Sequence, residues 1–185
     1  MAPLVTKRLI NVDDYYKMAE TGMLKPDENV ELINGEIYTM APIGSKHADV
    51  VRQLSIFLIR SIIDEAIVSS QQPVHIDRWN ELEPDIALLK YKQMGYPTAH
   101  PNPSDILMII EVSDTTYNYD RHVKLPIYAA AGIPAYWIIR LDKKCIEVFE
   151  EPQDDQYLKR TLYTPGDHII FMDKPFDVAE ILLTK

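Results

Sequence analysis

Three ionisable side chains in the middle of the chain have the types and the spacing of a metal-binding catalytic site. Asp85 follows Pro84 at the start of the apolar run 86–89, and Glu111 comes directly after the apolar run 106–110. Short apolar runs of this kind are typical of buried strands, so each carboxylate is expected at the mouth of a strand, where water is scarce. Two carboxylates in such surroundings need a cation, and Lys124 lies in the next predicted helix.

This combination suits the hydrolysis of a phosphodiester. Mg²⁺ is bound in proteins through one or two carboxylates and keeps several of its waters. A water on the ion becomes a usable nucleophile, and the ion neutralises charge that builds up on the phosphodiester. We therefore expect Asp85 and Glu111 to bind Mg²⁺ or Mn²⁺. Lys124 would position the water, stabilise the transition state or, if burial lowers its pKa, deprotonate the water.

Each of these residues also has a purely structural interpretation. Asp85 after a proline is common in turns and at strand starts. Glu111 could pair with a surface lysine. Lys124 and Asp120 have the spacing of an ion pair on one face of a helix, which would contribute about 0.2–0.5 kcal/mol. The complete pattern favours the catalytic interpretation.

Four further residues are candidates for lining the site. His47 stands at the start of a predicted long helix, where it could contact a metal-bound water or a phosphate, or simply be exposed. Strand alternation allows Glu31, on a predicted hairpin, to face the site. Asp120 precedes Lys124, and Ser113 either lines the site or caps the turn that follows it. The other histidines share no metal-ligand spacing, and no role is assigned to them; they are His75, His100, His122 and His168.

The elements that must position these residues form the centre of the chain. A helix over 47–66, about five turns long, follows from apolar residues recurring at three- and four-residue steps. A second helix is expected over 119–131, ended by Gly132 and bent at Pro126. Strands are expected over 67–76, with an interruption at Pro73, and over 86–89, 106–110 and 135–140.

The two ends of the chain add further elements. A helix begins after Asn11 and runs to Glu20, and Asn34-Gly35 predicts the turn of a hairpin with strands 30–33 and 36–40. Residues 77–82 are expected to form a loop tip, and the insertion 95–105 a mobile loop near the site. An antiparallel meander over 146–150, 158–163 and 168–172 precedes a short element over 176–183.

The order helix, three strands, helix, strand favours an α/β fold, in which helices cover a mixed sheet. The chain has 185 residues, of which 46% are hydrophobic, so a single domain over 1–185 is expected.

Charge and cysteine content exclude several classes of protein. The formal net charge of −9 argues against a protein that coats nucleic acid tightly, because affinity for a polyanion depends on cations that displace counterions. One cysteine, Cys145, excludes an intramolecular disulfide and a thiolate metal cage. No apolar run approaches the roughly 18 residues of a membrane-spanning helix, and no signal-peptide pattern is present. A cytoplasmic protein without a membrane partner is expected.

The motifs resemble those of the Uma-type endonucleases, a bacterial family of the PD-(D/E)XK restriction-endonuclease-like superfamily. The matching motifs, which together cover nearly the whole chain, are Glu31-Leu32-Ile33-Asn34-Gly35-Glu36, His47, Glu83-Pro84-Asp85, Ile109-Ile110-Glu111-Val112-Ser113, Asp120-Arg121 with Lys124, and Tyr128 to Ile138. The resemblance implies a core of helix, three strands, helix and strand, with an N-terminal β-hairpin and C-terminal antiparallel strands.

The resemblance also implies roles for individual residues. Asp85 and Glu111 would be the metal ligands, and Glu31 matches the family pattern. The lysine usual in the superfamily would fall at position 113, where this chain has Ser113, so Lys124 would substitute for it from the following helix.

Two functions remain open from the sequence. The first is a metal-dependent DNA endonuclease that binds DNA weakly, as a homodimer that gathers basic residues on one face. The residues concerned are Arg52, Arg60, Lys90, Lys92 and Arg121. The second is a catalytically silent nuclease-like fold used as a binding or regulatory module, which Ser113 and the negative charge would favour.

Overall fold

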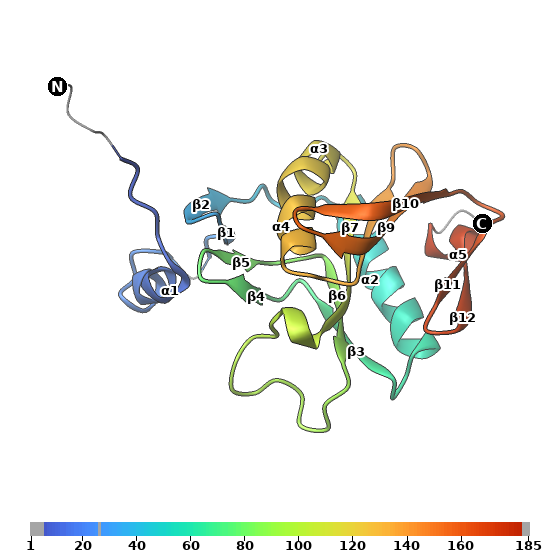
Figure 1. The fold of residues 1–185 in the computed structure, drawn as a ribbon, viewed down its shortest axis with the longest axis horizontal. Helices are drawn as coiled ribbons and strands as arrows, with labels where there is room; N and C mark the ends of the chain where they lie inside the picture. Colours follow the sequence, from blue (N-terminus) through green and yellow to red (C-terminus); the bar gives the residue numbers. More distant parts are fainter. Residues whose placement is uncertain (1–5, 26, 183–185) are drawn as a thin grey trace.

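The computed structural model describes residues 6–25 and 27–182, and its centre is a six-stranded sheet (Figure 1). In order across the sheet, the strands are β10 (Gln156–Tyr163), β9 (Cys145–Gln153), β8 (Ala135–Arg140), β7 (Ile106–Ser113), β6 (Ile86–Lys90) and β3 (Ala66–Ser70). β7 and β8 run parallel, and the other neighbouring pairs run antiparallel. This mixed sheet, with helices packed against it, confirms the predicted fold class.

The parallel pair β7 and β8 is joined by a helical crossover in three pieces. These pieces are α3 (Tyr117–Tyr119), a π-helical turn (Asp120–Lys124) and α4 (Leu125–Ala130), where a continuous helix over 119–131 was expected. In the π-helical turn, the Leu125 N–H donates to the Asp120 carbonyl. Pro126 accounts for the irregularity, because its ring would clash with the carbonyl four residues earlier in a regular helix and it has no N–H to donate.

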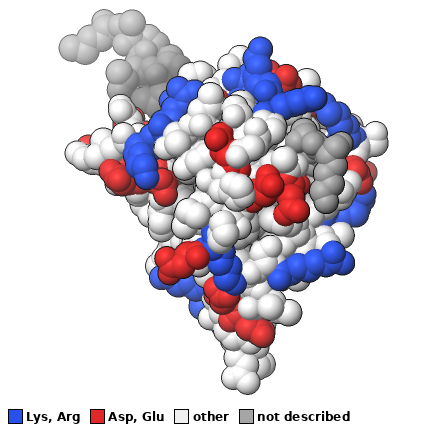
Figure 2. Space-filling model, turned by 90° about the vertical axis from the view of Figure 1, so that its right-hand side faces the viewer, with Lys and Arg blue, Asp and Glu red and all other residues white. Residues whose placement is uncertain are grey.

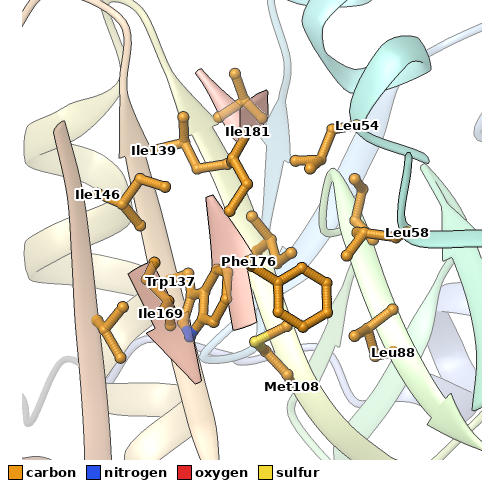
Figure 3. Close-up of a cluster of buried hydrophobic side chains, with 14 of the residues drawn as sticks. Leu54, Leu58, Leu88, Met108, Trp137, Ile139, Ile146, Ile169, Phe176 and Ile181 are labelled. Carbon is orange, nitrogen blue, oxygen red and sulfur yellow. The ribbon is translucent and has the colours of Figure 1, made fainter. Parts of the chain in front are cut away.

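Helix α2 (Ser45–Ser61) packs its apolar face into the same core as the strands of the six-stranded sheet. Figure 3 shows Leu54 and Leu58 of α2 on one side of this core and Trp137 of β8 on the other, with Phe176 between them. The helix ends earlier than the predicted 66, because Asp64 adopts a positive φ of 64° and the chain enters β3. Tyr136 and Trp137 are buried, as expected of core residues.

A second sheet, of four strands, carries the N-terminal hairpin. Its order is β2 (Glu36–Thr39), β1 (Val30–Ile33), β5 (Asn80–Leu82) and β4 (Val74–Asp77). The hairpin prediction is confirmed: Asn34 and Gly35 have φ of 51° and 76°, the positive values that a tight type I′ turn requires. Helix α1 (Val12–Glu20) is capped by the Asn11 side chain, as predicted.

Two predictions for residues 67–82 were wrong. The single interrupted strand is two strands, β3 and β4, which belong to different sheets. Gln71, with φ of 50°, and Pro73 redirect the chain between them. The predicted loop tip contains β5, which pairs with β1 through Leu32 and Glu81. A three-residue strand is stabilised by partners that are distant in sequence, so its own residues carry little signal.

The C-terminal region also differs from the predicted meander. β9 and β10 form its first hairpin, but β11 (His168–Phe171) pairs with β12 (Lys174–Asp177) in a separate two-stranded ribbon. The element expected over 176–183 is the end of β12 followed by α5 (Val178–Ile181), and its last residue lies outside the described part. None of the helices in the described ranges is long and apolar enough to cross a membrane.

Candidate active site

The antiparallel pairing of β6 with β7 brings Asp85 and Glu111 together. Ile86 lies opposite Ile110, so the residue before β6 and the residue near the end of β7 meet at the same edge of the sheet. The Asp85 N–H donates to Glu111 Oε2 at 3.3 Å, and the Val112 N–H donates to Asp85 Oδ2 at 2.8 Å. Each carboxylate is therefore held by the backbone of the neighbouring strand.

The Lys124 ammonium lies between two buried glutamates. Its Nζ atom is 3.0 Å from Glu111 Oε1 and 3.0 Å from Glu31 Oε1, and Lys124 is only 3% exposed. Asp85 and Lys124 thus both lie next to Glu111. The alternative of a surface ion pair between Lys124 and Asp120 is wrong, because both residues are buried and the Lys124 ammonium bonds Glu31 and Glu111.

His47 joins the site from the first turn of α2. Its Nε2 atom lies 2.7 Å from Asp85 Oδ1, and its side chain is 20% exposed. The hydrogen bond and the charge of Asp85 raise the pKa of His47 above its usual value, although burial opposes the shift. His47 therefore orients the Asp85 carboxylate and is not merely an exposed residue at a helix start.

Asp120 is held by hydrogen bonds from two hydroxyl groups. Ser113 Oγ donates to Asp120 Oδ2 at 2.5 Å, and Thr116 Oγ1 donates to the same oxygen at 2.8 Å. Burial raises the pKa of Asp120, while Lys124 and these two hydroxyls oppose the shift. Ser113 is fully buried, and its hydroxyl binds Asp120. Its sequence position had favoured a different role, that of capping the following turn.

All of these side chains except that of the fully buried Ser113 line one cavity of about 510 Å³. The walls come from the end of the hairpin and the loop that follows it, from the first residues of α2, and from the loop after β7. Two lysines, Lys46 and Lys124, face six carboxylates, which are Glu31, Glu83, Asp85, Glu111, Asp114 and Asp120. His47 is the other side chain in the lining that can carry a positive charge. The cavity therefore carries an excess of negative charge.

The charge excess alters the protonation of the buried groups. Burial raises the pKa of Glu111 well above its usual value, and the charge of Asp85 adds to the shift, while Lys124 opposes it. Burial favours the neutral amine of Lys124, but the charges of Glu111 and Glu31 outweigh burial, so its pKa lies well above the usual value. This direction favours the ammonium form of Lys124 at neutral pH, and therefore a role as a positive charge over the general-base role considered from the sequence.

Several residues of the site were not predicted. Tyr128 donates from its hydroxyl to Glu111 Oε1 at 3.3 Å, and Tyr119 donates to Glu31 Oε2 at 3.4 Å. Glu83 lines the cavity, and burial followed by the charge of Glu31 raises its pKa. Glu83 could have been recognised as a site residue because it stands two residues before Asp85 in the sequence. Tyr128 follows Lys124 by one helical turn and could have been found from that spacing.

The insertion 95–105 contributes no residue to the lining of this cavity. It connects the end of β6 with the start of β7, whereas Asp85 and Glu111 lie at the other ends of these strands. In Figure 1 it is the long yellow-green loop at the bottom of the view, and none of its residues lines the 510 Å³ cavity. The expectation of a loop near the site was wrong for this cavity, because antiparallel pairing separates the two ends of a strand.

The donor set fits a magnesium-type ion. Among the residues that the structure describes, no group of three or more His, Cys, Asp or Glu side chains is arranged to hold a metal ion. Mg²⁺, however, takes one or two carboxylates and completes its shell with water and substrate oxygens. Asp85 and Glu111 supply such a pair, since each carboxylate has about four acceptor positions. The excess of acids in the cavity would be relieved by a divalent cation.

A family model and a solved structure match nearly the whole chain. The family model Uma2, described as "Putative restriction endonuclease", matches residues 12–175. Among solved structures, the chain is similar to a "putative nuclease belonging to DUF820" from Anabaena variabilis ATCC 29413, with a TM-score of 0.72 and 14% sequence identity. The match covers 94% of this chain and 98% of that chain, and at this identity it shows a shared fold. No curated protein matches.

Proposed function

Because the chain belongs to the Uma2 family, described as "Putative restriction endonuclease", we propose that it is a metal-dependent nuclease that hydrolyses phosphodiester bonds in DNA. One observation carries the proposal: the carboxylates of Asp85 and Glu111 and the ammonium of Lys124 line the same cavity. The Glu111 carboxylate connects them, with Lys124 Nζ at 3.0 Å from Oε1 and the Asp85 N–H donating to Oε2 at 3.3 Å.

Asp85 and Glu111 would hold Mg²⁺ or Mn²⁺. When bound, the ion supplies a nucleophilic water and neutralises charge on the phosphodiester. Each carboxylate oxygen of Asp85 and Glu111 already has at least one partner, and the lone pairs that remain would be the acceptors for such an ion. His47, bonded to Asp85 Oδ1, fixes the orientation of this carboxylate in the way that outer hydrogen-bond partners fix metal ligands.

Lys124 would act as a fixed positive charge. Its raised pKa keeps it protonated, so it can donate to a phosphate oxygen and stabilise the negative charge of the transition state. Glu31 and Tyr128 support this role, because Glu31 pairs with the ammonium and Tyr128 donates to Glu111. Lys124 would thus replace, from the crossover helix, the lysine that is absent at position 113.

Contact with DNA would be weak and dependent on salt concentration. Figure 2 shows basic and acidic side chains intermixed on one face of the molecule, and two of the candidate DNA contacts are already paired. Lys92 Nζ lies 2.7 Å from Asp105, and Arg52 lies 3.0 Å from Asp49. A homodimer that brings the basic residues of two copies together would increase the affinity, so we include a homodimer in the proposal.

A silent nuclease-like module is the alternative function. It was favoured by Ser113, but a buried ammonium lies next to Glu111 and removes most of that argument. The remaining support is the acidic character of the chain, with its formal net charge of −9.

The test combines metal binding with cleavage. Mn²⁺ binding is measured by calorimetry, and cleavage is measured on supercoiled and single-stranded DNA, for wild type, Asp85→Asn and Lys124→Met. We expect wild type to bind Mn²⁺ and to cut at least one substrate, Asp85→Asn to lose both properties, and Lys124→Met to bind the ion without cutting. Asp142→Asn, an exposed carboxylate paired with Arg140, is the matched control and should behave as wild type. The nuclease proposal fails if wild type cuts no DNA in Mn²⁺ or if Asp85→Asn cuts equally well.

A further inference from the structure

A second cavity, of about 240 Å³, adjoins the candidate active site. Asn29 and Glu83 line both cavities, so the two are neighbours across these residues. The second cavity is built from α1, the residues around β5 and His100 of the insertion between β6 and β7. None of the catalytic roles proposed above uses its side chains.

Aromatic rings form one side of this second cavity. The ring of Tyr16 lies parallel to the ring of His100, with 6.1 Å between centroids and 10° between planes. Tyr15 packs edge-on against Tyr16 at 5.7 Å, and Leu24 and Pro73 add apolar surface. Flat aromatic faces beside apolar surface are the platforms on which unpaired nucleobases stack.

A buried carboxylate, that of Glu81, gives the second cavity a hydrogen-bonding preference. Glu81 is 3% exposed, receives a hydrogen bond from the Tyr16 hydroxyl, and lies with Oε2 at 2.8 Å from His75 Nδ1. Lys25 is the one lysine among the described residues that line the cavity, against Glu28, Glu81 and Glu83. An anion such as a phosphate is disfavoured there, whereas a neutral group that donates N–H bonds is favoured.

From these features we infer that the second cavity receives an unpaired nucleobase of the strand whose phosphodiester occupies the active site. This inference rests on the proposed nuclease function and specifies its substrate as single-stranded DNA. In a duplex the bases are stacked and paired, and a base can enter a protein pocket only after it is extruded. The Glu81 carboxylate accepts from the exocyclic amine of cytosine or adenine, whereas thymine offers only its N3–H, which lies between two carbonyl oxygens that a carboxylate repels.

The experiment measures both binding and cleavage for labelled oligonucleotides. Single-stranded oligo-dC, single-stranded oligo-dT and a blunt duplex of equal length are compared by fluorescence anisotropy with Ca²⁺ and by cleavage with Mn²⁺. The variants are Tyr16→Leu, which removes the ring, Tyr16→Phe, which keeps it, and Glu81→Gln. Tyr91→Leu is the matched control, because Tyr91 is 53% exposed and lines neither cavity. Thermal unfolding verifies that each variant is folded.

We expect wild type to bind and cut oligo-dC in preference to the duplex. Tyr16→Leu should bind oligo-dC about tenfold more weakly, a loss in the range measured for stacking of one base, and it should raise KM more than it lowers kcat. Tyr16→Phe should retain most of the binding, and Tyr91→Leu should match wild type. Glu81→Gln should reduce the preference for oligo-dC over oligo-dT.

The results separate this inference from the nuclease proposal. Binding of oligo-dC that depends on Tyr16, without any cleavage, would support the nucleobase cavity and reject the nuclease function. Cleavage of DNA that is equal for duplex and single strands, and unchanged in Tyr16→Leu and Glu81→Gln, would support the nuclease and overturn the nucleobase cavity. Absence of both binding and cleavage would overturn both.

Discussion

Two buried glutamates occupy the same row of the central sheet and have opposite electrostatic surroundings. Glu111 on β7 lies opposite Ile138 on β8, which in turn lies opposite Glu147 on β9. Glu111 is 3% exposed and Glu147 is 1% exposed. Arg160 lies 2.9 Å from Glu147 and Arg140 lies 3.7 Å from it, whereas Glu111 shares the Lys124 ammonium with Glu31.

The difference shows how one position in a sheet can serve structure or chemistry. Glu147 faces the guanidinium groups of Arg160 and Arg140, and Arg140 also pairs with Asp142. Two guanidinium groups thus face two carboxylates, so the charge of Glu147 is neutralised and no further cation is needed. Glu111 shares one ammonium group, that of Lys124, with Glu31, and further carboxylates surround it. A cation therefore remains to be supplied. Buried carboxylates without enough cations are expensive to maintain, and such an arrangement is typical of functional sites.

The largest effect that separates the two glutamates is expected in catalysis. Glu111→Gln should lower the rate of DNA cleavage by roughly 10³-fold, because the proposed metal ligand loses its charge. Glu147→Gln should leave the rate within about twofold of wild type, because Glu147 lines neither of the two cavities. Single-turnover cleavage with Mn²⁺ measures both variants. Equal losses in the two variants would contradict the functional distinction.

The second effect concerns the free energy of unfolding. Lys124→Met should destabilise the metal-free protein by about 3 kcal/mol at pH 7, because Glu31 and Glu111 are left buried without their cation. Arg160→Met should cost about 1 kcal/mol or less, since Arg160 has a 53% exposed side chain and Arg140 still faces Glu147. Urea unfolding measures both values. The comparison breaks if Arg160→Met is the more destabilised variant.

Metal binding should stabilise one region and not the other. At Mn²⁺ concentrations ten times its Kd, wild type should gain about 1.4 kcal/mol in free energy of unfolding. Glu147→Gln should gain the same amount, and Glu111→Gln should gain nothing. Thermal unfolding with and without EDTA gives the measurement. A gain that persists in Glu111→Gln would mean that the ion binds elsewhere.

The smallest effect is a pH dependence that comes from Asp120. Its pKa is raised in the folded protein, so the folded state binds the proton more tightly than the unfolded chain does. This contribution to stability is therefore present at low pH and is lost as the pH rises through the folded pKa. Ser113→Ala removes a hydrogen bond to the charged form of Asp120 and should raise the pKa of Asp120 further. When the pH is lowered from 7 to 5, the free energy of unfolding of Ser113→Ala should therefore increase more than that of wild type. Asp120→Asn should lack this dependence, and urea unfolding without metal at both pH values tests it.

Much of the candidate site could be predicted from local patterns. The apolar runs before Glu111 and after Asp85 identify buried strands, and Asn34-Gly35 identifies the hairpin that carries Glu31, because these signals depend on neighbours in sequence. The catalytic, metal-binding or lining roles assigned from the sequence remain predictions, and they concern Asp85, Glu111, Lys124, Glu31, His47, Ser113 and Asp120.

Other features could not be predicted from the sequence in the same way. In the π-helical turn, both Asp120 and Lys124 are buried. Their four-residue spacing in the sequence is equally typical of an exposed ion pair on a helix. β5 and the separate ribbon of β11 and β12 depend on strand partners far along the chain. The location of the insertion 95–105 follows from the antiparallel pairing of β6 with β7, which its composition does not reveal.

The sequence by itself determined the residue types at the strand ends, the order of the core elements around the site and the family. These follow from apolar periodicity and short motifs, which act over a few residues. The tertiary structure decided how many cations each buried carboxylate has, and therefore which glutamate in the row has a charge left to neutralise. The tertiary structure also sets the pKa of Lys124, which depends on burial and on the charges of Glu31 on the hairpin and Glu111 on β7. The reason is that electrostatic energy depends on distance in space and not on separation along the chain.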